Sequence, residues 1–131
     1  MAPTLVFDQS GPARGPLYAV LGSAGGSVII QFMVKTLVGM MDWGLDPQQA
    51  MSMVDFGAAN LPRTNIGGEH PNIDTTDNGD HDPLVQELRR LGHHVNLADQ
   101  SSGLTAIARD SAGWVGGADP RREGLVAGDT R

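Results

Sequence analysis

The chain has 131 residues, of which 40% are hydrophobic and 18% charged, a composition typical of one folded domain and not of a disordered segment. Its formal net charge of −6 argues against nucleic acid or an anionic membrane as a partner. It contains no cysteine, which excludes disulfide bonds and thiolate chemistry.

The N-terminal third is predicted to form a β-hairpin followed by a buried helix. Residues 4–7 and 16–22 are short β-favouring segments joined by a turn-rich connection. After the pair Gly25 and Gly26, Ser27 is placed to cap a helix. That helix is apolar on nearly every face, as expected for a helix buried between two layers.

Two further helices are expected on either side of a polar segment. Asp46 and Pro47 are predicted to open a short helix, as its N-cap and its first helical residue. Residues 55–81 are polar, acidic and rich in Gly, Asn and Pro, which indicates a long excursion or an ordered surface loop. Asp82 is predicted to cap the next helix, which should end at Gly92.

Three strands at 93–98, 103–110 and 113–119 complete the predicted order. In the second of them, Leu104 and Ala106 alternate with their neighbours with the period of a half-buried strand. Hairpins on both sides of a helical middle favour an α+β fold, in which helices pack on an antiparallel sheet, over alternating βαβ units.

The glycines at 25 and 26 are the main candidate site. A strand that runs through glycines into a helix directs backbone N–H groups and the positive end of the helix dipole toward one point, which favours an anion. Residues 22–28 lack the lysine of a P-loop and the dinucleotide-binding fingerprint. Gly25 and Gly26 would permit the close approach of an oxyanion hole, which needs two backbone N–H donors. A tight turn where helix and sheet pack closely is the alternative.

The other candidate sites are interpreted as structural. The acidic segment DTTDNGDHD is similar to a calcium loop but has a valine where a glutamate ligand is needed. The four histidines fit no zinc spacing, so neither a metal nor a cofactor is predicted. Thr4 does not lie at a free N-terminus and is interpreted as a strand residue, not a nucleophile. Arg121 and Arg122, which follow Asp119, are expected to hold the tail by salt bridges.

Six segments, in order and over essentially the whole chain, carry a family resemblance: MAPTLVF, GSAGGS before an apolar helix, GLDPQQAM, LRRLGHHV, GLTAIAR and GWVGGADPRREGLVAGD. Together they resemble the C-terminal part of the small subunit of γ-glutamyltransferase (γ-glutamyltranspeptidase). The segment VDFGAANLPR is similar to the version of the family with F-G-x-x-N and not to the version with F-H-H.

The resemblance implies the αββα sandwich of N-terminal-nucleophile hydrolases, with residues 1–131 as the C-terminal portion of a small-subunit domain. It implies γ-glutamyl transfer or hydrolysis, on glutathione and related γ-glutamyl amides, by a threonine that self-cleavage frees. Carried over to this sequence, Gly25 and Gly26 would form the oxyanion hole. A periplasmic or secreted location is also implied.

The resemblance also implies partners. The family's nucleophile lies upstream of a segment S-S-M-[SA]-P-T, and this chain begins at the methionine of that segment. The isolated chain is therefore expected to be inactive, and to work with the large subunit and the N-terminal part of the small subunit.

Two other functions stay open at this stage: a non-catalytic complementing or orphan fragment, and an anion-binding module that uses the same glycines. No membrane partner is expected. Residues 1–8 lack the features of a signal peptide. The apolar stretch 28–45 is interrupted by polar and charged residues, whereas a transmembrane helix needs about 20 mostly apolar ones.

Overall fold

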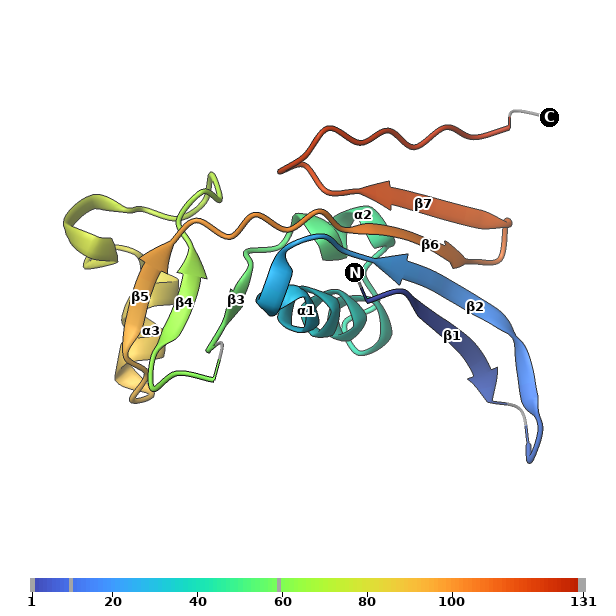
Figure 1. The fold of residues 1–131 in the computed structure, drawn as a ribbon, viewed down its shortest axis with the longest axis horizontal. Coiled ribbons are helices and arrows are strands. Elements are labelled where there is room, and N and C mark those ends of the chain that lie inside the picture. The colour runs from blue at the N-terminus through green and yellow to red at the C-terminus, as the bar shows by residue number, and fades with distance from the viewer. Residues whose placement is uncertain (1, 10, 59, 130–131) are drawn as a thin grey trace. The chain divides into compact units, whose positions relative to one another are not determined.

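The computed structural model describes residues 2–9, 11–58 and 60–129 (Figure 1). The chain divides into two compact units. The first unit contains the residues up to Met53 and those from Ser102 onward, and the second contains Val54–Ser101. The candidate site lies entirely in the first unit.

A four-stranded antiparallel sheet forms the frame of the first unit, with strand order β1-β2-β6-β7. Both predicted hairpins are confirmed: β1 pairs with β2, and β6 pairs with β7. The second hairpin closes at Asp110, whose carboxylate accepts hydrogen bonds from the N–H groups of Ala112 and Gly113. The strands are β1 (Thr4–Gln9), β2 (Arg14–Gly22), β6 (Thr105–Arg109) and β7 (Trp114–Ala118).

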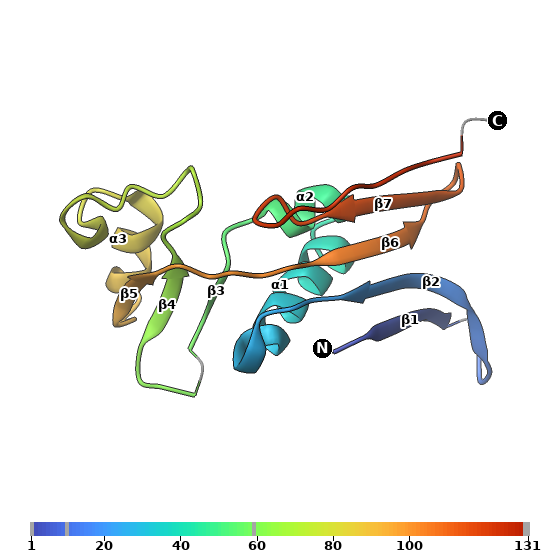
Figure 2. The same cartoon turned by 45° about the horizontal axis from the view of Figure 1, so that its top comes forward.

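Two helices, α1 (Ile29–Met41) and α2 (Pro47–Ser52), cover one face of this sheet (Figure 2). The predicted alternation in β6 is confirmed, because Ala106 and Ala108 are buried against the helices and Ile107 is exposed. Helix α2 packs closely on β7: a Cβ added to Gly117 would lie 2.3 Å from Cε of Met51. The buried residues of this core are Ala19, Leu21, Ile29, Phe32, Met33, Met40, Ala50, Met51, Leu104, Ala106 and Ala108.

Helix α1 differs from its prediction in two respects. It is buried on one face only within the described residues, since Ile30 is 69% and Val34 53% exposed. Lys35, by contrast, is buried, and its Nζ donates to the carbonyl oxygens of Met51 and Met53, at 3.1 Å each. Cations are favoured at the C-terminal end of a helix such as α2 because the last carbonyls there lack partners within the helix. No helix among the described residues has the length and apolar character needed to cross a bilayer.

The second unit contains a three-stranded sheet with order β3-β4-β5. Its parallel pair β4 and β5 is joined through α3, so this segment is a βαβ unit, in contrast to the antiparallel arrangement predicted from the sequence. The polar segment 55–81 contributes β3 and β4. The four residues of β4, TNIG, show no alternation that predicts a strand. The elements are β3 (Phe56–Gly57), β4 (Thr64–Gly67), α3 (Pro83–Arg90) and β5 (Val95–Ala98).

The helix boundaries follow the predicted local signals. Asp46 caps α2 in a capping box with Gln49, and Pro47 is the first helical residue. Asp82 caps α3 by accepting from two backbone N–H groups, and Gly92 follows the helix with φ of 93°.

Candidate active site at the β2–α1 junction

The candidate site is the short connection between the end of β2 and the start of α1. Strand β2 ends at Gly22, and the 3-10 turn η1 (Gly26–Val28) leads into α1. Ser27 lies inside this turn and does not cap a helix, which corrects its predicted role. No side chain among the described residues caps η1. The Ile29 N–H instead donates to the carbonyl oxygen of Gly26 and so closes the turn.

Gly25 and Gly26 both have backbone conformations that favour glycine. Gly25 has φ of 134° and ψ of 15°, and Gly26 has φ of 65°. They face different surroundings. A Cβ on Gly25 would lie 2.5 Å from Cε2 of Phe32, whereas a Cβ on Gly26 would have nothing within 4 Å. The pair therefore rests on the core through Gly25 and is open to solvent at Gly26.

The residues just before the pair are tied to the start of β6. The Ala24 N–H donates to the carbonyl oxygen of Gly103 at 3.3 Å, and the Gly103 N–H donates to Oγ of Ser23, also at 3.3 Å. These two bonds continue the pairing of β2 with β6 beyond Gly22. The glycine pair thus follows directly from a hydrogen-bonded segment of the sheet.

The electrostatics of the junction favour an anion. No acidic residue lies in the first turn of η1 or of α1. Among residues 2–9, 11–58 and 60–129, no acceptor is found for the N–H groups of Gly25 and Gly26. Unpaired N–H groups at the start of a helix carry partial positive charge, so they can stabilise a negative oxygen.

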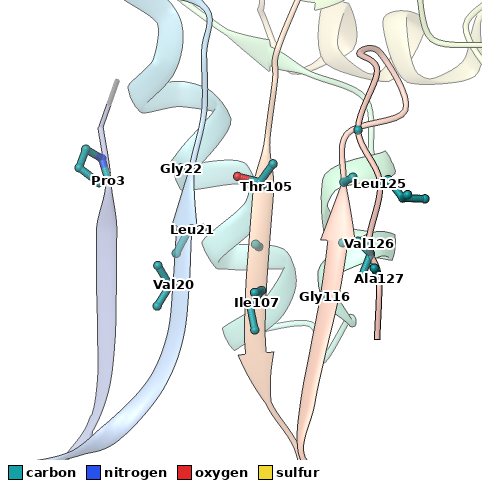
Figure 3. A pocket seen from close by; sticks show the side chains of 14 residues that line it. Pro3, Val20, Leu21, Gly22, Thr105, Ile107, Gly116, Leu125, Val126 and Ala127 are labelled. Atoms are coloured by element: carbon teal, nitrogen blue, oxygen red, sulfur yellow. The ribbon is translucent and has the colours of Figure 1, made fainter. Parts of the chain in front are cut away.

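A hollow lies on the face of the four-stranded sheet that points away from α1 and α2. Its volume is about 500 Å³, and the 14 residues that line it include no charged side chain. Figure 3 shows Val20 and Ile107 on neighbouring strands, with Leu125 and Val126 on the C-terminal stretch beside β7. A γ-glutamyl group carries an ammonium and a carboxylate, and nothing charged in this hollow would recognise them.

The other predicted residues take structural places. Thr4 lies in β1, where its hydroxyl donates to the carbonyl oxygen of Ala2 at 3.3 Å. In the acidic segment, Asp74 accepts from the backbone N–H and the hydroxyl of Thr76. Among the residues that the structure describes, no group of three or more His, Asp or Glu side chains is arranged to hold a metal ion.

The predicted salt bridge near the C-terminus is present, and it belongs to a larger buried cluster. Arg121 Nη1 lies 3.2 Å from Oδ1 of Asp119, and both side chains are almost fully buried. Arg121 also donates to the carbonyl oxygens of Met51 and Met53, at 3.2 and 2.8 Å. It therefore joins the C-terminal segment to the end of α2.

Asp119 also binds Ser102, a contact that was not predicted from the sequence. The Ser102 hydroxyl donates to Oδ2 of Asp119 at 2.5 Å. Burial raises the pKa of Asp119, but the hydrogen bonds from Ser102 and from two backbone N–H groups, with the charge of Arg121, outweigh burial and leave the pKa below its usual range. Asp119 is therefore ionised at neutral pH. No local sequence signal joins positions 17 residues apart, so only the fold reveals this pair.

Comparisons with known proteins identify the family. The model of the family Gamma-glutamyltranspeptidase matches residues 1–129. A mutant gamma-glutamyltranspeptidase from Helicobacter pylori is similar in structure, with TM-score 0.71, 23% identity, and coverage of 93% of this chain and 61% of that chain. A highly active mutant of the enzyme from Pseudomonas nitroreducens has TM-score 0.76, 20% identity, and coverage of 100% and 62%. A cephalosporin acylase from Bacillus halodurans has TM-score 0.69, 24% identity, and coverage of 86% and 20%.

This chain spans about three fifths of the length of the two transpeptidase chains. At these identities the structural matches show a shared fold, and with the sheet topology they confirm the predicted α+β architecture, an antiparallel sheet with packed helices. The family match covers nearly every residue, and the chain therefore belongs to the gamma-glutamyltranspeptidase family.

Proposed function

We propose that this chain supplies the oxyanion hole for γ-glutamyl transfer or hydrolysis, acting on glutathione and related γ-glutamyl amides. The observation that carries the proposal is the pair of consecutive positive-φ glycines, Gly25 and Gly26, at the junction of β2 and α1. The nucleophile is a threonine hydroxyl from polypeptide outside this sequence. The family match supports this reaction class.

The two backbone N–H groups act on the charge that develops during the reaction. Attack of the threonine oxygen on the γ-carbonyl carbon forms a tetrahedral intermediate, whose oxygen becomes negative. Gly25 and Gly26 donate hydrogen bonds to that oxygen. The C–N bond then breaks, the leaving amine takes the proton that the threonine hydroxyl has lost, and a γ-glutamyl ester of the threonine remains. Water or an amine then attacks the ester through a second intermediate of the same kind. Donors already held in place need no reorganisation at the transition state, and each contributes about 2.7–4 kcal/mol.

Exposed apolar faces support the proposal that further polypeptide completes the enzyme. Leu5, Val20 and Ile107 are paired across β1, β2 and β6 and form one row on the face of the sheet away from the helices. They are 60%, 38% and 50% exposed. The outer face of α1 is also apolar and exposed. Large apolar surfaces of this kind are typical of an interface. We assign both faces to the rest of the transpeptidase, its large subunit and the N-terminal part of its small subunit.

The oxyanion hole is tested by replacing the Gly26 N–H with an ester oxygen, by semisynthesis, in the complete enzyme. This change removes the donor and keeps the glycine. We expect kcat for a γ-glutamyl anilide to fall about 100- to 1000-fold. An ester at Gly113 is the matched control. Gly113 is also an exposed glycine, but its N–H donates to Asp110 in the turn between β6 and β7. Equal rates for the Gly26 ester and the unmodified enzyme would refute the proposal.

The isolated chain provides a second test. We expect it to show no turnover of a γ-glutamyl anilide, since the nucleophile comes from other polypeptide. Turnover that disappears in Thr4→Ala would contradict this.

The exposed faces equally favour a non-catalytic complementing fragment as a second candidate. Both candidates predict that the chain alone binds a hydrophobic dye, and they differ in whether the Gly26 ester affects catalysis after assembly.

A further inference from the structure

Asp119 holds both residues that flank Gly103. Its Oδ2 accepts from the Ser102 hydroxyl at 2.5 Å and from the Leu104 N–H at 3.1 Å. Asp119 is 3% exposed, so these bonds are shielded from water. Breaking bonds to a buried charged acceptor costs more than breaking the same bonds at the surface. The start of β6 is therefore held by one side chain from beyond the end of β7.

The opposite side of the carboxylate is anchored to the helices. Oδ1 of Asp119 accepts from the backbone N–H of Arg121 at 3.0 Å and from its guanidinium at 3.2 Å. That guanidinium is itself bound to the carbonyl oxygens at the end of α2. Hydrogen bonds therefore fix Asp119 from two sides. Asp119 in turn holds Ser102 and Leu104 in place.

Gly103 connects the residues held by Asp119 to the candidate oxyanion hole. Its N–H donates to the side-chain Oγ of Ser23, and its carbonyl oxygen accepts from the N–H of Ala24, the residue just before Gly25. The contact is also close in space, because a Cβ on Gly103 would lie 3.2 Å from Cβ of Ala24. A displacement of Gly103 would therefore move the segment that leads into the glycine pair.

We propose that Asp119 is a positioning residue that sets the location of the Gly25 and Gly26 amides through Ser102 and Gly103. The inference rests on the proposed function for its effect on catalysis. Asp119 touches neither the glycines nor the reacting atoms, so its influence on the reaction is indirect. Because the oxyanion exists only in intermediates and transition states, misplaced amides should lower kcat and leave KM nearly unchanged.

The test is Asp119→Asn in the complete enzyme, meaning this chain assembled with the polypeptide that supplies the nucleophile. Asparagine keeps the shape but lacks the charge and one acceptor oxygen. We expect kcat per folded molecule to fall about 10- to 100-fold, the effect typical of a displacement near 1 Å, with KM within about threefold. Deuterium uptake by the peptide 23–28 should rise at the same time, measured by mass spectrometry. Ser102→Ala removes one of the four bonds and should give a smaller change of the same kind, which covers the case where Asp119→Asn does not assemble.

Asp110→Asn is the matched control. Asp110 is also a carboxylate that accepts two backbone N–H groups in the first unit, but it lies in the far turn of the sheet. We expect faster exchange in that turn, unchanged uptake in 23–28 and unchanged kcat.

Unchanged uptake in 23–28 for both Asp119→Asn and Ser102→Ala would overturn the inference, and so would a change confined to KM. The Gly26 ester separates this failure from failure of the proposed function. If the ester leaves kcat intact, the oxyanion role is wrong, whereas the exchange measurement still decides whether Asp119 positions the loop.

Discussion

A methyl group added to Gly25 would meet the ring of Phe32, whereas one added to Gly26 would meet open space. For Gly25→Ala, a backbone with φ of 134° costs about 1–3 kcal/mol, and overpacking against a ring carbon at 2.5 Å adds about 1–3 kcal/mol. For Gly26→Ala, only the left-handed conformation at φ of 65° contributes, about 1–2 kcal/mol. The free energy of unfolding should therefore fall by about 2–6 kcal/mol in the first variant and by about 1–2 kcal/mol in the second.

Urea unfolding of the 131-residue chain, followed by circular dichroism, measures both losses. A double-mutant cycle tests the steric cause: in a Phe32→Leu background, the smaller side chain should reduce the loss from Gly25→Ala and leave that from Gly26→Ala unchanged. Equal losses for the two alanine variants, or a Gly25→Ala loss that Phe32→Leu does not change, would refute the reasoning.

Two further predictions concern carboxylates. Asp82→Ala should lower the free energy of unfolding by about 2 kcal/mol, more than Asp46→Ala. The reason is that the Asp82 carboxylate is buried and accepts from the N–H groups of Leu84, Val85 and Asp74, whereas the Asp46 cap is exposed. Urea unfolding of the two variants side by side measures both losses, and equal losses would contradict the prediction. The pKa of Asp119 is lower in the folded chain than its ordinary value near 3.9, so its contribution to stability is present above about pH 4 and is lost as the pH falls through the lower folded value. Unfolding free energies measured from pH 6 to pH 2 should therefore fall less steeply in Asp119→Asn, and identical slopes would show that Asp119 is not the group responsible.

The elements that the sequence alone predicted are those whose signals are local. The caps at Asp46 and Asp82 and the stop at Gly92 depend on residues within a few positions of each other, as does the alternation along β6. Strand β4 was missed because its four residues carry no pattern and it exists by pairing with β3 and β5. The glycine pair was found from the sequence, and its role as an oxyanion hole stays a prediction.

What only the tertiary structure decided is how distant residues hold that pair. The packing of Phe32 against Gly25, the bonds of Gly103 to the loop and the contact of Asp119 with Ser102 join segments from both ends of the chain. The same holds for Lys35, which interrupts an apolar helix in the sequence but in the fold is buried against two carbonyl oxygens at the end of α2. A buried polar group is stable only where hydrogen-bonding partners surround it. The packing of the whole unit, and not the neighbouring residues in the sequence, determines where those partners lie.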